Sequence, residues 1–238
     1  MYCLESRVRY SEVNSRKRLT LPSLLDYLQD CCIFQSEELG IGVDYMAERH
    51  IAWILSSWQI EILASPGLGE RIRVNTWPYD FKGFYGYRNF TVEDDRGEIL
   101  ARANSVWVFM DIEKMRPVRI FGEVIERYQD GFGEALAGPW ADRKIAVPRQ
   151  WERKSPIRVA GFQIDTNHHM NNGKYIQAAE EFLPEGFEVR GLRAEYKKAA
   201  VLGDVLYPLV TVEADSVTVV LADEGDKPYA VVELLAKK

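Results

Sequence analysis

Residues 162–182 read FQIDTNHHMNNGKYIQAAEEF and hold two of the three histidines in the chain. An aspartate and three asparagines stand among and just after these histidines, within residues 165–172. The segment joins a stretch of strand-like composition to a stretch with helical spacing. We therefore expect a polar strand-to-helix junction, where the start of the helix offers backbone N–H groups and the positive end of its dipole.

This polar cluster allows more than one interpretation. Asn171 or Asn172 would serve as an ordinary N-cap of the helix. A zinc site would need Asp165, His168 and His169, but adjacent histidines point in different directions and no HExxH or CxxC motif adds ligands. No Gly-x-Ser-x-Gly elbow is present, and the cysteines are far away in the sequence. A carboxylate acting as general base toward water, with His or Asn as hydrogen-bond donor, suits acyl transfer to water.

The composition indicates a soluble globular protein, with 47% hydrophobic and 28% charged residues. A length of 238 residues fits one large domain or two of roughly 100 residues each. We expect a cytoplasmic protein without a membrane partner, because no apolar run approaches the roughly 20 residues of a membrane helix and no signal or transit pattern is present. The net charge of −6 argues against bulk nucleic-acid binding, and three cysteines imply no disulfide framework.

A helix is predicted near the start of the chain, with Thr20 as its N-cap and Gly40 as its stop. Its apolar positions follow a spacing of 3.6 residues and are Leu21, Leu24, Leu25, Leu28 and Cys32. Cys32 continues this stripe, so we interpret it as a core residue and not as a nucleophile.

Strand-like runs rich in Val, Ile and aromatic residues follow the helix, at 50–65, 70–81, 85–95 and 98–112. One helix followed by an antiparallel meander is an α+β unit. Residues 128–150 lose this periodicity, so we predict a linker there between a first domain at 1–127 and a second at 151–238.

The pattern starts again after the linker, which indicates an internal repeat. The paired positions are Glu12 and Asp165, Asn14 and Asn167, Arg16 and His169, Glu61 and Glu195, and Gly69 and Gly203. Arginine does not deprotonate in proteins and cannot transfer protons as histidine does. The second copy is therefore predicted to be catalytic and the first copy to be scaffold.

The segment IDTNHHMNNGKYI (164–176) resembles the Asp-x-Asn-x-His-x-Asn-Asn-x-Lys-Tyr motif of the acyl-acyl-carrier-protein thioesterases of plant plastids and bacteria. Residues 84–90, 102–120 and 194–204 resemble further segments of that family, in the same order along the chain. The resemblance implies an α+β fold of two tandem hotdog domains, each an antiparallel sheet wrapped around a central helix. It also implies that the two domains pair as an intramolecular pseudo-dimer, with acyl-chain binding in the first domain.

The resemblance implies hydrolysis of fatty acyl-acyl carrier protein to free fatty acid and holo-acyl carrier protein, without cofactor or metal. Asp165 would activate water, Asn167 would orient it, and His169 would bind or polarise the thioester. The residues expected to bind substrate are Trp53, Trp58, Asn171, Asn172 and Lys174. The chain departs from the family at Ala199 and Ala200, where a catalytic glutamate and a cysteine are expected, so Asp165 is left as the main candidate for the base.

Acyl carrier protein is strongly acidic, so we expect it to dock on basic residues at 15–19, at 196–198 and at Lys174. Three alternatives stay open. An acyl-CoA thioesterase would keep the site and change the partner, and a fatty-acyl binding protein would keep the pocket without turnover. A hotdog dehydratase would pair a histidine with a carboxylate of the other copy, for which Glu12 opposite Asp165 is available. A homodimer is also left open.

Overall fold

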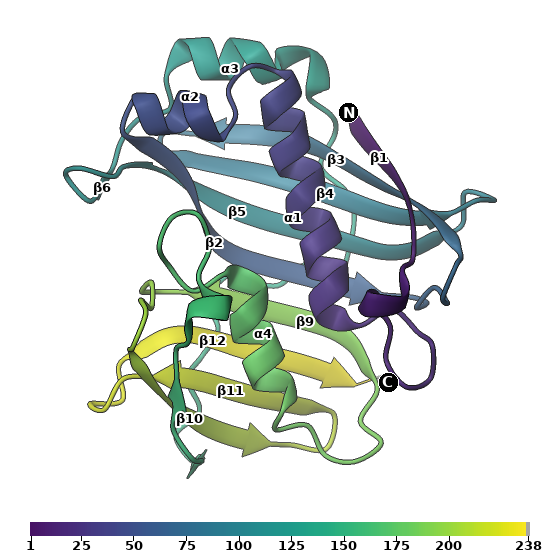
Figure 1. Ribbon diagram of the computed structural model, residues 1–238, viewed down its shortest axis with the longest axis vertical. Coiled ribbons are helices and arrows are strands. Elements are labelled where there is room, and N and C mark those ends of the chain that lie inside the picture. Colours follow the sequence, from purple (N-terminus) through teal and green to yellow (C-terminus); the bar gives the residue numbers. More distant parts are fainter. Residues whose placement is uncertain (237–238) are drawn as a thin grey trace. The chain divides into compact units, whose positions relative to one another are not determined.

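The computed structural model describes residues 1–236, which divide into two compact units. Unit 1 comprises Met1–Ser56 and Ile62–Trp140, and unit 2 comprises Ser57–Glu61 and the chain from Ala141 onward. Each unit contains an antiparallel sheet and one longer helix (Figure 1). Within residues 1–236, no helix has the length and apolar character needed to cross a membrane.

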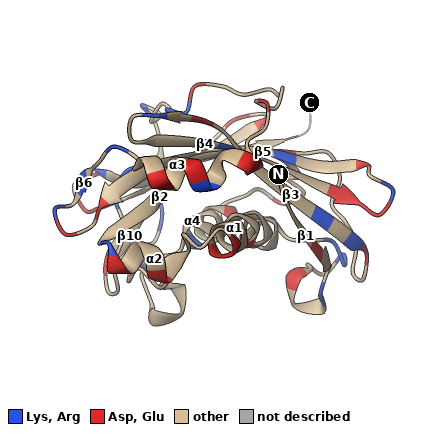
Figure 2. Cartoon of the chain, turned by 90° about the horizontal axis from the view of Figure 1, so that it is seen from above, with Lys and Arg blue, Asp and Glu red and all other residues tan. Residues whose placement is uncertain are grey.

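In unit 1, the strands lie in the order β1-β3-β4-β5-β2, and α1 packs against β1 and β3 (Figures 1 and 2). The strands are β1 (Tyr2–Arg7), β2 (Ile51–Ile62), β3 (Arg71–Lys82), β4 (Tyr85–Asp94), β5 (Ile99–Asp111) and β6 (Arg116–Pro117). The helices are α1 (Leu21–Glu38), α2 (Val43–Glu48) and α3 (Gly122–Tyr128), with 3-10 helices η1 (Tyr10–Glu12) and η2 (Gln129–Gly131). The four predicted strand runs are confirmed, since they form β2 to β5.

The first helix begins and ends where the sequence predicts. Thr20 caps α1, because its Oγ1 accepts the N–H of Ser23 at 3.3 Å. Gly40 follows the helix at φ 68°, a left-handed conformation that glycine adopts without strain. The predicted apolar stripe is buried, and Cys32 is only 7% exposed, which confirms it as a core residue.

In unit 2, the strand order is β2 (its residues 57–61), β9, β12, β11, β10, β7, and α4 packs against β11 and β12. The strands are β7 (Glu152–Arg153), β8 (Ile157–Arg158), β9 (Val189–Tyr196), β10 (Val205–Val212), β11 (Ser216–Ala222) and β12 (Pro228–Ala236). The helices are α4 (Asn172–Glu180) and the 3-10 helix η3 (Gly161–Gln163). The domain boundaries at 127 and 151 stay predictions.

Both units contain the repeat. At the candidate site, however, each residue of unit 2 corresponds to a residue of unit 1 that lies two positions later than predicted. In unit 1, Asn14 Oδ1 accepts the N–H groups of Arg16 at 2.9 Å and Arg18 at 3.1 Å. In unit 2, Asp165 Oδ1 accepts the N–H groups of Asn167 at 2.8 Å and His169 at 3.3 Å. Asn14 therefore corresponds to Asp165, and the predicted pairing of Glu12 with Asp165 is wrong.

The later part of the predicted repeat is confirmed by equivalent backbone bonds. Gly69 donates its N–H to Val8 O at 2.9 Å, and Gly203 donates its N–H to Val159 O at 3.0 Å. The structure departs from the predicted register only in the segment before each helix, where the prediction depends on the shared acidity of Glu12 and Asp165. The turn instead requires any side-chain acceptor two residues before its first donor, and asparagine and aspartate supply it equally well.

Candidate active site

The Asp165–His169 segment folds into a tight turn in front of α4, in which the Asp165 side chain is half-buried. Its Oδ1 accepts the N–H of Asn167 at 2.8 Å and that of His169 at 3.3 Å. The backbone closes the turn, because the N–H of Asp165 donates to His169 O at 2.8 Å. His168 is exposed and adopts φ 61°, a left-handed backbone conformation within the turn. The structure thus brings the three predicted catalytic residues together in one hydrogen-bonded turn.

The turn between β9 and β10 lies directly beside this segment. The N–H of Met170 donates to Ala200 O at 2.8 Å, and the N–H of Ala200 donates to Tyr175 Oη at 2.8 Å. Ala199, where the resemblance predicts a glutamate, is exposed next to this contact. In unit 1, Arg18 corresponds to His169 and Ser65 corresponds to Ala199. Arg18 Nη1 donates to Ser65 O at 3.2 Å, so these two positions are in contact in unit 1. The position that lacks its glutamate therefore borders the Asp165 turn.

The start of α4 uses its own polar residues as caps. Asn171 Oδ1 accepts the N–H of Gly173 at 2.8 Å, and Asn171 O accepts that of Lys174 at 2.9 Å. These two N–H groups are engaged, so fewer of the backbone N–H groups that the start of a helix offers remain for a ligand. Lys174 Nζ donates to Gln177 Oε1 at 3.1 Å. The contacts of Asn171 are those of an N-cap, and substrate binding by Asn171, Asn172 and Lys174 stays a prediction.

Two tyrosines, the buried Tyr175 and the half-buried Tyr196, hold the backbone around the site and were not among the predicted site residues. Tyr175 holds Ala200, and Tyr196 donates from its hydroxyl to Asn172 O at 3.0 Å. The two rings meet edge to face, with centroids 5.6 Å apart. Burial raises the pKa of Tyr175 to about 12, so its hydroxyl stays neutral at physiological pH. Tyr175 lies in the segment 164–176 and Tyr196 in the segment 194–204, so both stand in segments that resemble the family, although neither segment reveals which atoms the hydroxyl groups contact.

Because Asn14 and not Glu12 corresponds to Asp165, Glu12 is no longer the candidate acid of the dehydratase alternative. Its Oε2 accepts the N–H of Arg9 and the hydroxyl of Tyr27, each at 2.7 Å. Burial opposes ionisation, but the hydrogen bonds and charge of Arg9 and the hydrogen bond of Tyr27 lower the pKa of Glu12. This carboxylate caps a 3-10 helix, and the residue opposite Asp165 is the neutral Asn14. The dehydratase alternative therefore loses the acid on which it depended.

The predicted tryptophans lie in apolar packing. Trp58 on β2 is 1% exposed. Trp53, earlier on the same strand, has its ring centroid 5.9 Å from that of Phe81 and 4.8 Å from that of Phe109. Both environments are compatible with a core role, and binding of an acyl chain by Trp53 and Trp58 stays a prediction.

The structure does not assemble a metal centre at the predicted cluster. Within the described part of the chain, no group of three or more His, Cys, Asp or Glu side chains is arranged to hold an ion. The zinc alternative at Asp165, His168 and His169 is therefore not formed.

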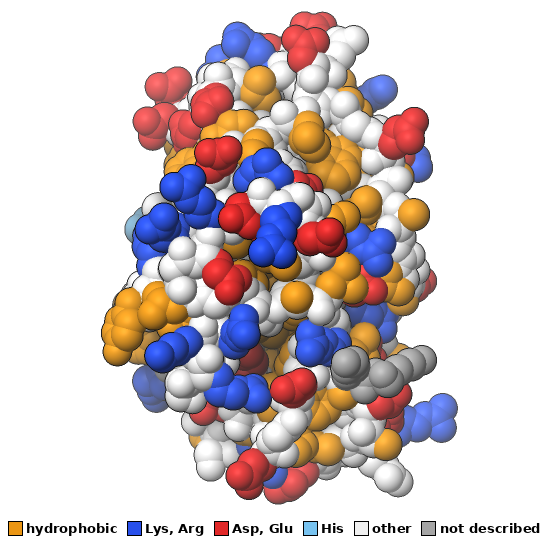
Figure 3. All heavy atoms as spheres, turned by 90° about the vertical axis from the view of Figure 1, so that its right-hand side faces the viewer, with side chains coloured by type: hydrophobic (Ala, Val, Ile, Leu, Met, Phe, Trp, Pro, Cys, Tyr) orange, Lys and Arg blue, Asp and Glu red, His pale blue; other side chains and the backbone are white. Residues whose placement is uncertain are grey.

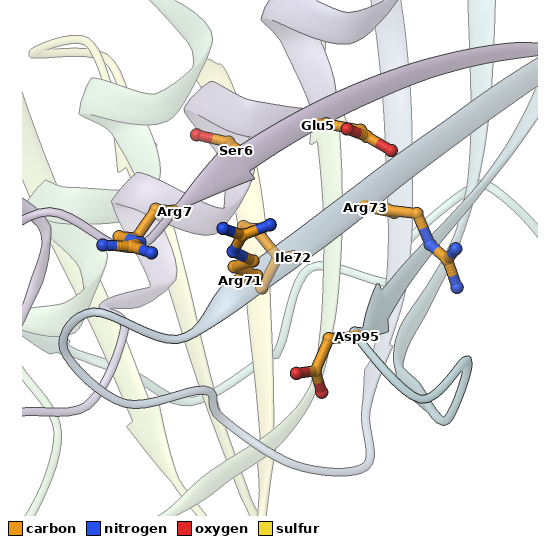
Figure 4. Close-up of a pocket in the computed structure, with 7 residues that line it drawn as sticks. All are labelled: Glu5, Ser6, Arg7, Arg71, Ile72, Arg73 and Asp95. Atoms are coloured by element: carbon orange, nitrogen blue, oxygen red, sulfur yellow. The ribbon is translucent and has the colours of Figure 1, made fainter.

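A pocket of about 420 Å³ opens in unit 1 (Figure 4). It is lined by Glu5, Ser6, Arg7, Arg71, Ile72, Arg73 and Asp95. Arg7 on β1 and Arg71 on β3 are register partners, so two cations stand side by side at this pocket. None of the predicted site residues lines it.

The predicted basic positions of unit 2 have mixed surroundings. Lys197 Nζ pairs with Glu195 at 2.8 Å, whereas Lys198 Nζ lies 4.4 Å from the ring centroid of Tyr229. Glu195 also accepts the N–H of Ile145 at 3.0 Å, so its carboxylate is engaged by both a lysine and the backbone. On the face shown in Figure 3, Lys and Arg side chains lie among acidic and apolar ones. Docking of a carrier protein at these basic positions stays a prediction.

Comparison with known proteins agrees with this arrangement. The family model described as the acyl-ACP thioesterase N-terminal domain matches residues 1–128, and that of the C-terminal domain matches residues 148–223. A chloroplastic acyl-[acyl-carrier-protein] hydrolase of Cuphea viscosissima is 26% identical over 222 residues, which are 87% of this chain and 54% of the relative. The chain spans about half the length of the first curated relatives that it matches.

Solved structures of the same class share the fold over nearly all of the chain. The 12:0-ACP thioesterase of Umbellularia californica superposes with a TM-score of 0.85 at 21% identity, covering 99% of this chain and 96% of that one. An acyl-ACP thioesterase of Bacteroides thetaiotaomicron gives 0.82 at 22% identity, covering 99% and 97%. The chain belongs to the acyl-ACP thioesterase family, and its predicted α+β fold of two tandem hotdog domains is confirmed. How the two domains pair stays a prediction.

Proposed function

We propose that this chain hydrolyses fatty acyl-acyl carrier protein to free fatty acid and holo-acyl carrier protein. The observation that carries the proposal is the Asp165 turn, in which the motif residues of the family hold a half-buried carboxylate by two backbone amides. Membership of the family supports the choice of a thioester as the bond that is cleaved. The corresponding turn of unit 1 has a neutral amide at Asn14, which supports placing the chemistry in unit 2.

In this proposal, Asp165 is the general base. Its Oδ1 is engaged by the turn, so its second oxygen takes a proton from a water molecule as that water attacks the thioester carbonyl carbon. Asn167 orients the water, and His169 donates a hydrogen bond to the developing oxyanion. The tetrahedral intermediate then loses the thiolate, which receives the proton from Asp165. Water supplies the new oxygen of the fatty acid, and no covalent acyl-enzyme is formed.

Ala199 favours a second candidate, a fatty-acyl binding protein without turnover. The family's expected glutamate is replaced by a methyl group at a position that borders the Asp165 turn. If that glutamate were the only competent base, the chain would retain the acyl site and lose hydrolysis. Its signature would be stoichiometric binding of acyl chain with no release of fatty acid.

The proposal is tested by incubating the purified protein with acyl-acyl carrier proteins of several chain lengths and with the matching acyl-CoAs. We expect faster release of fatty acid from the carrier protein. Preference for coenzyme A would support the acyl-CoA thioesterase alternative. Binding without release from either substrate would support the binding-protein alternative.

A further inference from the structure

Three large apolar side chains of unit 2 are exposed on two loops. Phe162 in η3 is 80% exposed, and Leu202 and Val201 in the β9–β10 turn are 66% and 44% exposed. A phenylalanine or a leucine kept in water gives up the favourable free energy of burial that contact with a partner would provide. Single exposed apolar residues are ordinary, but a group on neighbouring loops is typical of an interaction site.

Backbone hydrogen bonds place these two loops side by side. The N–H of Val159, just before η3, donates to Asp204 O at 2.9 Å, and Gly203 returns a bond to Val159 O at 3.0 Å. On its other side the β9–β10 turn is bonded to Met170, the residue that follows His169. The three apolar residues, which we call the loop patch, therefore border the Asp165 turn.

The loop patch has cations at its edge. Arg158 Nη1 donates to Gly203 O at 3.1 Å, which holds its guanidinium against the turn. Lys198 lies just before the turn, over the ring of Tyr229. The carboxylate of Asp204 is also present, and its Oδ2 accepts a backbone N–H of the same turn at 3.0 Å. The apolar centre is thus flanked by the cations Arg158 and Lys198 and by the carboxylates of Asp204 and of the neighbouring Asp165 turn. Both carboxylates accept backbone N–H groups within their own turns, whereas the two cations complement a partner that is acidic and carries exposed aliphatic side chains.

We infer that the loop patch is the docking site for an acidic carrier protein that delivers the acyl thioester to the Asp165 turn. This inference rests on the proposed function and adds to it the surface on which the partner sits. It differs from the basic segments predicted from the sequence, because its centre is apolar and charge acts only at its rim. Interface energy concentrates in such central apolar contacts, while rim charges mainly affect the association rate.

The test is the dissociation constant for holo-acyl carrier protein, measured by titration calorimetry. The double variant Phe162→Ser/Leu202→Ser should weaken binding at least about tenfold, because it removes the centre of the interface. Both side chains are exposed, so the variant should fold normally, which its thermal unfolding checks. The matched control is Tyr10→Ser/Leu68→Ser, in the 3-10 helix and the equivalent turn of unit 1, where these side chains are 84% and 41% exposed.

We expect the control variant to bind within about twofold of wild type. Equal affinities of the two double variants, or no binding by wild type, would overturn the inference. The readout does not depend on turnover, so it separates the two claims. If wild type binds through the loop patch and releases no fatty acid, the proposed function fails and the docking site stands.

Discussion

Removing the side-chain acceptor of the Asp165 turn should destabilise unit 2, whereas removing only its charge should not. Asp165→Ala deletes the acceptor of two N–H bonds, of 2.8 and 3.3 Å, made by Asn167 and His169. Each such bond contributes about 0.5–1.5 kcal/mol, and water replaces part of it at this half-buried site, so we expect a loss of about 1–2 kcal/mol in unfolding free energy. For a chain of this size, each kcal/mol corresponds to about 2–4 °C in Tm.

Asp165→Asn should change the unfolding free energy by less than about 0.5 kcal/mol, because its carbonyl oxygen accepts the same two bonds. Asn14 already makes this turn in unit 1, with bonds of 2.9 and 3.1 Å. The assay is thermal and denaturant unfolding of both variants, with Asn14→Ala as the matched change in the other unit. Equal destabilisation by Asp165→Asn and Asp165→Ala would refute the reasoning, since the negative charge and not the acceptor would then hold the turn.

Three further predictions concern catalysis and pH. His169→Ala should lower turnover of acyl-acyl carrier protein by about 10²-fold, as expected for loss of an oxyanion donor. The matched change in unit 1, Arg18→Ala, should leave turnover within about twofold of wild type. Equal losses in the two variants would contradict the role of His169 as oxyanion donor. Ala199→Glu should change turnover by less than about tenfold if Asp165 already serves as base; a gain of about 10²-fold or more would mean that the native site lacks its base. Burial, reinforced by the neighbouring negative charge, raises the pKa of Glu180 from 4.5 to about 7. The folded state then holds a proton that the unfolded state has released, so the unfolding free energy should fall as pH rises from about 4.5 to about 7, and Glu180→Gln should remove this decline. An unchanged pH dependence in that variant would contradict the assignment.

The parts of the fold that depend on periodicity could be predicted from the sequence. The stripe from Leu21 to Cys32 has the spacing of one helix face, and Thr20 and Gly40 supply the start and stop signals. The strands β2 to β5 are long and rich in β-branched and aromatic residues, so their composition alone distinguishes them from helices. Spacing, cap residues and strand composition are properties of short segments, so they predict the positions of single helices and strands from the sequence alone.

The register of the repeat at the candidate site could not be predicted, because it depends on contacts across the fold. Glu12 resembles Asp165 in charge, yet its carboxylate is used by Arg9 and by Tyr27 on α1. Asn14 resembles Asp165 only in having an oxygen at the same distance from the backbone. Side-chain geometry, and not charge, therefore decides which residues correspond.

The support beneath the site was missed for a similar reason. Tyr175 and Tyr196 read as ordinary apolar residues of a helix and a strand. Their hydroxyl groups become informative only when Ala200 and Asn172 are seen to be their partners. The position of Ala199 beside the Asp165 turn follows from the Met170 to Ala200 bond, which joins segments about thirty residues apart.

The central claim is that the Asp165 carboxylate performs thioester hydrolysis, and it is tested most directly by the turnover of one acyl-acyl carrier protein by wild type and Asp165→Asn. The two proteins should share the same turn and nearly the same Tm, so the comparison isolates the charge. We predict that wild type releases free fatty acid and that the variant is slower by about 10²–10⁴-fold. Near-normal turnover by Asp165→Asn, or no release by wild type, would contradict the claim.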